Sequence, residues 1–121
     1  MLFRSVHAFL SAVRTALAQM YGLQLVPAPV ADLLHASGWF TQIVPQKFHV
    51  PVGTWHEDPE LRALGAQYRD STTAYAWSMH PILSEWLSDA EATVLVNDYV
   101  EEINNVDGMW VTCFTVHARR A

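Results

Sequence analysis

The sequence predicts a small α+β fold that contains more helix than strand, and three observations support this. Apolar residues recur at helical spacing in residues 6–20 and again between residues 58 and 103. Residues 39–50 and 109–118 instead combine aromatic and β-branched residues in rough alternation, which is typical of strands. The chain has no repeat, low-complexity tract or linker, and its 121 residues suit a single domain, 1–121, with a core of its own.

The first helix is predicted from an apolar stripe that ends at Gly22, because glycine commonly follows the last turn of a helix. The stripe consists of Val6, Phe9, Leu10, Val13, Leu17 and Met20.

The next elements are a short helix and a strand. Prolines break the chain at 27–29, a short helix runs on to Gly38, and the strand 39–50 follows. Because Pro45 has no N–H to donate to a ladder, we expect an edge strand or a bulge at this residue.

The second half of the chain is predicted to be mostly helical. A helix begins at Asp58-Pro59, and we expect it to break at 70–73, because Asp, Ser and Thr side chains compete for backbone hydrogen bonds. A further helix over 75–86 is expected to kink at Pro81. Ser88-Asp-Ala-Glu91 is a capping box that opens the last helix, and Asp107-Gly108 turns into the final strand. The prediction is thus about five helices covering a two-stranded antiparallel pair.

Composition narrows the classes of function. Hydrophobic residues make up 51% of the chain and charged residues 16%, against a usual charged share of roughly 25%. So many apolar residues in a small domain favour a partner chain, a dimer or an apolar pocket. The net charge of −5 argues against nucleic acid, and Arg119-Arg120 is an isolated basic pair.

The sequence also suggests where the protein works. No apolar run approaches the roughly 18 residues of a membrane span, and the first residues lack the features of a secretory signal. Cys113 is the only cysteine, so no internal disulfide can form, and it lies in an apolar run as a small core residue. We therefore expect a cytoplasmic protein, with a nuclear one as the alternative, and no membrane partner.

Few residues suggest chemistry. The six histidines have no metal-ligand spacing, so no metal site is predicted. His80 could act as a general base, since the reference pKa of histidine is about 6.5, although a core or surface histidine is the simpler interpretation. Paired carboxylates such as Glu101-Glu102 are interpreted as solvated or as helix-dipole partners.

Residues 33–120 resemble the C-terminal portion of class I S-adenosylmethionine-dependent methyltransferases of fungal secondary metabolism, including the regulator-like members. The most specific likeness is Phe48-His-Val-Pro-Val-Gly-Thr-Trp-His-Glu-Asp-Pro-Glu-Leu-Arg-Ala-Leu-Gly65. It is similar to the family's strand, Pro-Ile/Val-Gly-x-Trp turn and Asp-Pro-x-Leu-Lys/Arg helix closed by glycine. Leu34–Trp39 resembles the helix before the family's sixth strand. Trp86–Glu91 is similar to a helix start, and Val116–Arg120 to the end of the last strand, although both lack the family's glycine.

The resemblance implies a partial Rossmann-like fold that keeps the substrate side and lacks the donor side. The chain has no glycine-rich donor loop, because its glycines at 22, 38, 53, 65 and 108 never come close together, so no cofactor is expected. In the family the last strand lies between two neighbours. Here the strand 109–118 would keep one open edge, which we expect to be completed by dimerisation.

The resemblance also implies a site. The turn tryptophan and the inserted helices cover the substrate in the family, so we expect Trp55, Tyr68, Trp77 and Met79 to bind an apolar small molecule, with His80 and Tyr75 as proton carriers. Core packing is the alternative for each of these residues taken singly.

Three functions follow from this reading. The favoured one is a methyltransferase-derived small-molecule domain that does not transfer methyl groups alone and works as a cyclase or isomerase without the methyl donor. The second is the substrate-side half of a methyltransferase that needs a separate donor-binding chain. The third is a non-catalytic interaction module that docks through the open strand edge.

Overall fold

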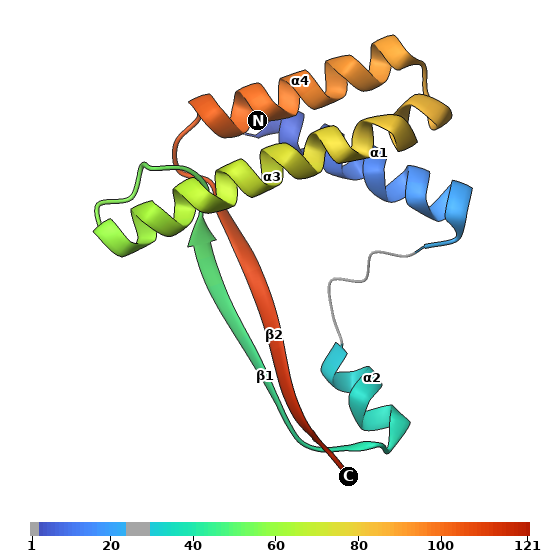
Figure 1. Ribbon diagram of the computed structural model, residues 1–121, viewed down its shortest axis with the longest axis vertical. Coiled ribbons are helices and arrows are strands. Elements are labelled where there is room, and N and C mark those ends of the chain that lie inside the picture. The colour runs from blue at the N-terminus through green and yellow to red at the C-terminus, as the bar shows by residue number, and fades with distance from the viewer. Residues whose placement is uncertain (1–2, 24–29) are drawn as a thin grey trace. The chain divides into compact units, whose positions relative to one another are not determined.

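The structure, a computed structural model, describes residues 3–23 and 30–121 (Figure 1). The predicted break at 27–29 lies outside these residues. Four helices and a two-stranded antiparallel sheet form the described part, which confirms the α+β class. In chain order the elements are α1 (Arg4–Tyr21), α2 (Val30–Ser37), β1 (Phe40–Pro51), α3 (Pro59–Trp86), α4 (Asp89–Asn105) and β2 (Trp110–Arg120).

The chain divides into two compact units. The first, which we call the helical unit, contains α1, the turn 50–58, α3 and α4, and ends at Trp110. The second, which we call the ribbon unit, contains α2 and most of β1 and β2. This division into units does not test whether residues 1–121 fold as one domain, which stays a prediction.

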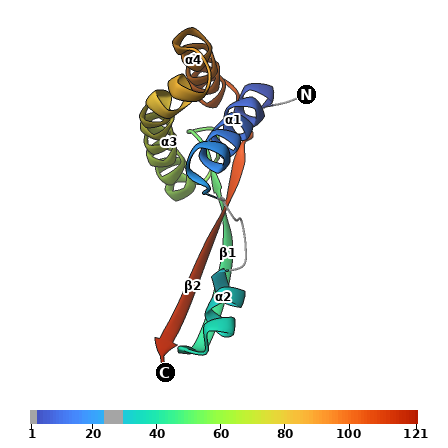
Figure 2. The same cartoon turned by 90° about the vertical axis from the view of Figure 1, so that its right-hand side faces the viewer.

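The core of the helical unit lies where α1, α3 and α4 pack on one another (Figure 2). In α1 and α4 the buried residues recur every three or four positions, as a packed helix face requires. Val6, Phe9 and Val13 of the predicted stripe are buried, whereas Leu17 and Met20 are half-buried and Leu10 is 41% exposed. Ala16, which was not part of the predicted stripe, is also buried. The buried residues of the three helices include Val6, Phe9, Val13, Ala16, Ala76, Leu83, Ala92, Val96, Tyr99 and Ile103.

Helix α3 is continuous, so the predicted break at 70–73 is wrong, and the described residues form four helices where about five were expected. The hydroxyls that were expected to compete with the backbone are used inside the fold instead. Thr73 Oγ1 donates to the carbonyl of Arg69 at 2.9 Å, and Thr72 Oγ1 makes a short hydrogen bond with the hydroxyl of Tyr99 on α4. Pro81 lies inside the helix and does not end it.

Helix starts follow the sequence closely. Asp58 Oδ1 accepts hydrogen bonds from the N–H groups of Glu60 and Leu61 at 2.8 and 3.2 Å, and Ser88 Oγ accepts from the N–H of Glu91 at 3.1 Å. The Glu91 carboxylate accepts from the Ser88 hydroxyl at 3.0 Å, a variation on the usual capping box.

The start of α1 is capped from α4. Phe3 precedes α1 and offers no side-chain cap. The Glu102 carboxylate instead accepts from the N–H groups of Val6 at 3.0 Å and Ser5 at 3.4 Å. An acceptor here satisfies free N–H groups and complements the positive end of the helix dipole, so Glu102 joins α4 to α1.

The two strands are paired with one extra residue in β1. Val52 N–H donates to Met109 O, and Ala121 N–H donates to Trp39 O, so each pair of residues lies directly opposite. From Trp39 to Val52 the chain advances 13 residues, whereas from Met109 to Ala121 it advances 12, so the side of β1 has one residue more. Gln42 has φ 51°, the left-handed conformation found in a β-bulge, which places the extra residue there and not at Pro45. Each strand has one partner in this sheet, so β1 is an edge strand as predicted.

Candidate functional site

The turn 50–58, which carries the most specific part of the resemblance, is fixed against α3. Val50, Pro51, Val52 and Gly53 are buried, and Gly53 N–H donates to the carbonyl of Gly65 at 2.9 Å. Gly65 does not close a helix, as the resemblance implied, but lies inside α3 where the turn's backbone touches it. The glycine is needed for this close approach, because a side chain would fill the space that the turn occupies.

Trp55 packs within this turn. Its Nε1–H donates to Val52 O at 3.0 Å, and its ring meets that of Trp110 edge to face at 5.1 Å between centroids. His56 completes the group at 5.4 Å from Trp110. These contacts hold Trp55 as part of the turn.

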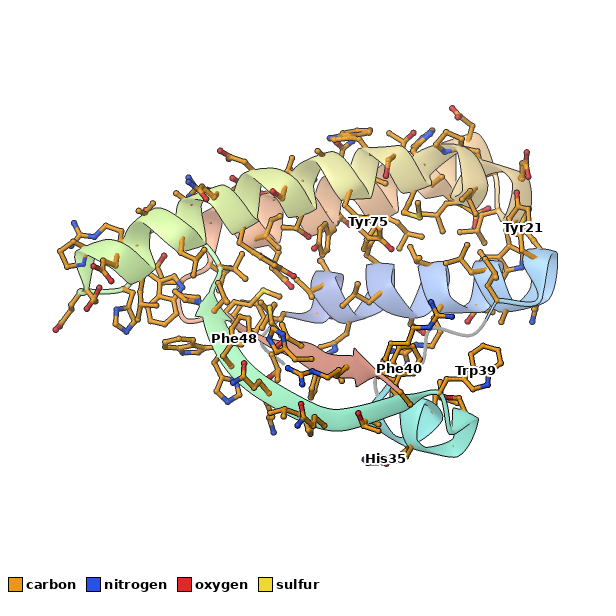
Figure 3. All side chains as sticks on the ribbon, turned by 60° about the horizontal axis from the view of Figure 1, so that its bottom comes forward. Tyr21, His35, Trp39, Phe40, Phe48 and Tyr75 are labelled. Carbon is orange, nitrogen blue, oxygen red and sulfur yellow. The ribbon has the colours of Figure 1, made fainter. Side chains whose placement is uncertain are left out.

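Tyr75 lies on another side of α3, facing α1 (Figure 3). Its ring meets Phe9 edge to face at 6.4 Å, and 40% of the residue stays exposed. Burial raises the pKa of Tyr75 above its ordinary value of 10.0. Burial also raises the pKa of Tyr99, opposed by the Thr72 hydrogen bond and reinforced by nearby Tyr75. Both phenols are therefore protonated at neutral pH and cannot act as proton acceptors there.

His80 is held between α3 and α4 by hydrogen bonds. Thr93 Oγ1 donates its proton to Asp89 O at 2.9 Å, so it must accept from His80 Nε2–H, also at 2.9 Å. This leaves Nδ1 of the neutral ring without a proton. The Ser84 hydroxyl lies 3.4 Å from Nδ1 and donates to Asp89 Oδ1 at 3.3 Å. His80 thus presents a basic nitrogen in a fixed orientation.

This cluster does not form the serine nucleophile of a hydrolase. Asp89 Oδ1 is 3.8 Å from His80 Nε2, and the Ser84 contacts exceed the usual length of an O–H hydrogen bond. A proton acceptor at His80 is the chemistry that this geometry allows.

The predicted site residues come together only in part. Trp77 is 44% exposed, and its ring centroid lies 6.0 Å from that of His80, so these two residues are neighbours. Tyr68 and Met79 are half-buried on α3. Trp55 and Tyr75 take part in the separate contacts described above. The predicted residues lie on the turn and on α3, and the ring contacts of Trp55, Tyr75 and Trp77 form three separate groups.

Two hollows formed by described residues are lined by other residues. In the ribbon unit, a hollow of about 620 Å³ is lined by Gly38, Trp39, Phe40, Arg120 and Ala121. Trp39 is 74% exposed at this end of the ribbon (Figure 3). The sequence prediction missed this pairing of Trp39 with Arg120, because it depends on the register that sets Ala121 opposite Trp39. In the helical unit, a hollow of about 420 Å³ is lined by Ser5, Asp98, Glu101, Glu102, Asn105 and Val106.

The ribbon unit has no buried residue among those described, 30–49 and 111–121. None of the side chains of α2 is buried. Six large apolar residues of this unit are at least 46% exposed: Val30, Leu33, Trp39, Val44, Phe48 and Phe114. A folded segment of this composition normally buries such side chains, so the ribbon unit presents an uncovered apolar surface.

The described residues contain neither a group of metal-ligating side chains nor a membrane-spanning helix. Over 3–23 and 30–121, no three His, Cys, Asp or Glu side chains are grouped as metal ligands would be. Within the same ranges, no helix has the length and apolar character needed to cross a membrane. No protein-family model, curated protein or solved structure matches this sequence.

Proposed function

We propose that this chain works as a subunit of a larger assembly and binds a second polypeptide through its ribbon unit. The observation that carries this proposal is that the ribbon unit buries none of its described residues while six large apolar side chains stay exposed. Of the three functions considered from the sequence, this is the interaction module, and it also fits a methyltransferase half that needs a partner chain.

The physical reason is that the ribbon lacks a core of its own. A two-stranded sheet is at best marginally stable in water without cover on at least one face. Opposite residues of an antiparallel pair share a face, so Val44 and Phe48 lie on one face of the ribbon and Phe114 on the other. Both faces therefore carry apolar side chains whose burial would yield roughly 25 cal/mol per Å². A bound polypeptide would supply that burial.

Amide hydrogen exchange on the dilute chain tests this proposal. We expect the backbone amides of β1 and β2 to exchange at least about tenfold faster than those of α1 and α4, because the helices share a core and the strands do not. Binding of a partner should slow the strand amides selectively. Strand amides that are protected as strongly as the helix amides in a chain shown to be monomeric would contradict the proposal.

A second candidate function rests on the His80 cluster. The fixed basic nitrogen beside half-exposed Trp77 favours proton transfer on a bound aromatic molecule, as in the cyclase or isomerase of secondary metabolism that the resemblance implies. In this reading the assembled protein binds the small molecule against Trp77, and His80 moves the proton.

His80→Gln tests this second candidate with a panel of hydroxylated aromatic polyketides as probes. We expect a bound probe to quench the tryptophan fluorescence of the wild type and of His80→Gln to a similar extent. The rate of any cyclisation or isomerisation should fall by about 10²-fold or more in the variant, because general-base catalysis contributes that much. Trp77→Phe is the control for the quenching. Unchanged fluorescence with every probe, or equal rates in wild type and His80→Gln, would remove the candidate.

A further inference from the structure

We propose that the partner of the ribbon is a second copy of this chain, and that the two copies pair β2 against β2 in antiparallel orientation across their free edges. This inference rests on the proposed function, since it names the polypeptide that completes the ribbon. It follows from the register of the two strands, the position of one proline and the distribution of charge along β2.

The register decides which backbone groups are free. Val52 and Met109 form a hydrogen-bonded pair, and bonded pairs recur at every second residue of an antiparallel ladder. His49 and Thr112 are therefore an opposite pair without ladder bonds, and their side chains meet, with Nδ1 and Oγ1 3.1 Å apart. Continuing along β2, the N–H and C=O groups of Thr112, Phe114 and Val116 point away from β1. These three residues form the free edge of β2.

The same register makes the free edges of β1 and β2 differ in their ability to hydrogen-bond to an added strand. On β1 the outward-pointing residues are His49, Lys47 and Pro45, and Pro45 has no N–H. Proline at this outward-pointing position removes no hydrogen bond between β1 and β2. It does remove one N–H that a strand added to the β1 edge would need. The β2 edge has no such interruption. Strand addition is therefore expected at β2.

This asymmetry favours a second copy over an unrelated strand. Two identical β2 edges related by a two-fold axis satisfy each other and give a four-stranded sheet in the order β1, β2, β2, β1. Both outer edges of that sheet are β1 edges interrupted by Pro45, so growth stops at the dimer. An unrelated strand added to one β2 edge would itself bring a new free edge.

The charges on β2 select the antiparallel orientation. Arg119 and Arg120 lie at one end of the strand, and no charged residue lies between Trp110 and Val116. Parallel pairing would place the two arginine pairs side by side, whereas antiparallel pairing sets each pair beside the apolar beginning of the other strand. Pairing centred on Phe114 engages all three outward residues. It also brings each Phe114, 58% exposed in the single chain, opposite its symmetry mate.

The experiment measures the solution mass of the full chain by light scattering over a range of concentrations. Val116→Pro removes one outward N–H from the β2 edge, and Lys47→Pro, the matched control, removes one outward N–H from the β1 edge. We expect the wild type and Lys47→Pro to be dimers, and the dimer dissociation constant of Val116→Pro to rise by at least about tenfold, because edge hydrogen bonds are lost. Phe114→Lys, which places like charges opposite each other, should weaken the dimer without constraining the backbone.

Amide exchange on the same samples shows whether each variant keeps its ribbon. In the dimer the amides of Thr112, Phe114 and Val116 should be protected as strongly as the inward amides of Cys113 and Thr115. In a monomer with an intact ribbon only the inward amides are slow. A Val116→Pro or Phe114→Lys chain that keeps slow inward amides and remains as strongly dimeric as the wild type would overturn the β2 edge assignment.

Pro45→Thr tests whether Pro45 stops further strands from adding to the outer β1 edges of the dimer. Because this change restores an N–H on the β1 edge, we expect species larger than a dimer that increase with concentration. A wild-type monomer whose strand amides all exchange fast would overturn the second copy while leaving another partner chain for the proposed function. A wild-type monomer whose strands are as protected as its helices would overturn both.

Discussion

Gly65→Ala is expected to destabilise the protein by about 3 kcal/mol or more, although alanine is the better helix former. Gly65 is buried inside α3, and a Cβ atom on it would overlap the backbone carbonyl oxygen of Gly53 and lie 2.9 Å from that of Pro51. Both obstacles are backbone atoms, so no side-chain rotation relieves the overlap. The turn would have to move away from α3 and lose the bond from Gly53 N–H to Gly65 O. Urea denaturation, monitored by helical circular dichroism, measures the effect.

Gly22→Ala is the matched control for that substitution. Gly22 also has a special conformation, φ 66° after the end of α1, but nothing lies within 4 Å of a Cβ placed there. Its expected cost is only about 1 kcal/mol, which comes from the left-handed backbone conformation. Equal stability of Gly65→Ala and the wild type would show that the turn does not touch α3 as described.

Phe9→Ala is expected to cost about 3 to 5 kcal/mol, because it empties the middle of the helical unit. Phe9 is fully buried, and its ring lies 4.4 Å from that of Tyr99 and 6.4 Å from that of Tyr75. The three rings come from three different helices, so the substitution weakens all three packing contacts together. The free energy of unfolding from urea titration gives the size of the loss.

Leu10→Ala provides the comparison for Phe9→Ala. Leu10 follows Phe9 directly in α1 but is 41% exposed, so its truncation leaves no closed cavity and should cost about 1 kcal/mol or less. Similar losses for the two variants would mean that the core does not centre on Phe9.

The two stability predictions concern the helical unit, whereas the proposed assembly concerns the ribbon unit. Neither Gly65 nor Phe9 belongs to the ribbon, so their variants separate loss of the helical core from loss of pairing. The edge variants on β1 and β2 instead leave every core residue of the helical unit in place. A change in solution mass without a change in helical stability would therefore report on the ribbon alone.

The sequence determined the local elements well. The apolar stripe of residues 6–20 predicted α1, Asp58 and Ser88 predicted the starts of α3 and α4, and alternating residues predicted both strands. These features depend on neighbours three or four residues away in a helix, or two in a strand, and that range is visible in a linear sequence. The α+β class followed from them.

The tertiary structure decided the rest. The break expected at 70–73 did not form, because Thr72 and Thr73 found hydrogen-bond partners on α4 and within α3. The expected site residues do not share one set of ring contacts, because Trp55 packs in its turn, Tyr75 packs against α1, and Trp77 lies beside His80. Whether those residues bind a small molecule stays a prediction.

The features that carry the proposals depend on distance in space. The need for glycine at position 65 arises from a turn more than ten residues away, and the free edge of β2 follows from a register set between Val52 and Met109. The extra residue at Gln42 likewise shows only when the two strands are aligned. Local sequence fixes which segments become helix or strand through short-range backbone and side-chain preferences. Long-range packing and pairing determine which of their atoms meet, and therefore which edge and which surface remain for a partner.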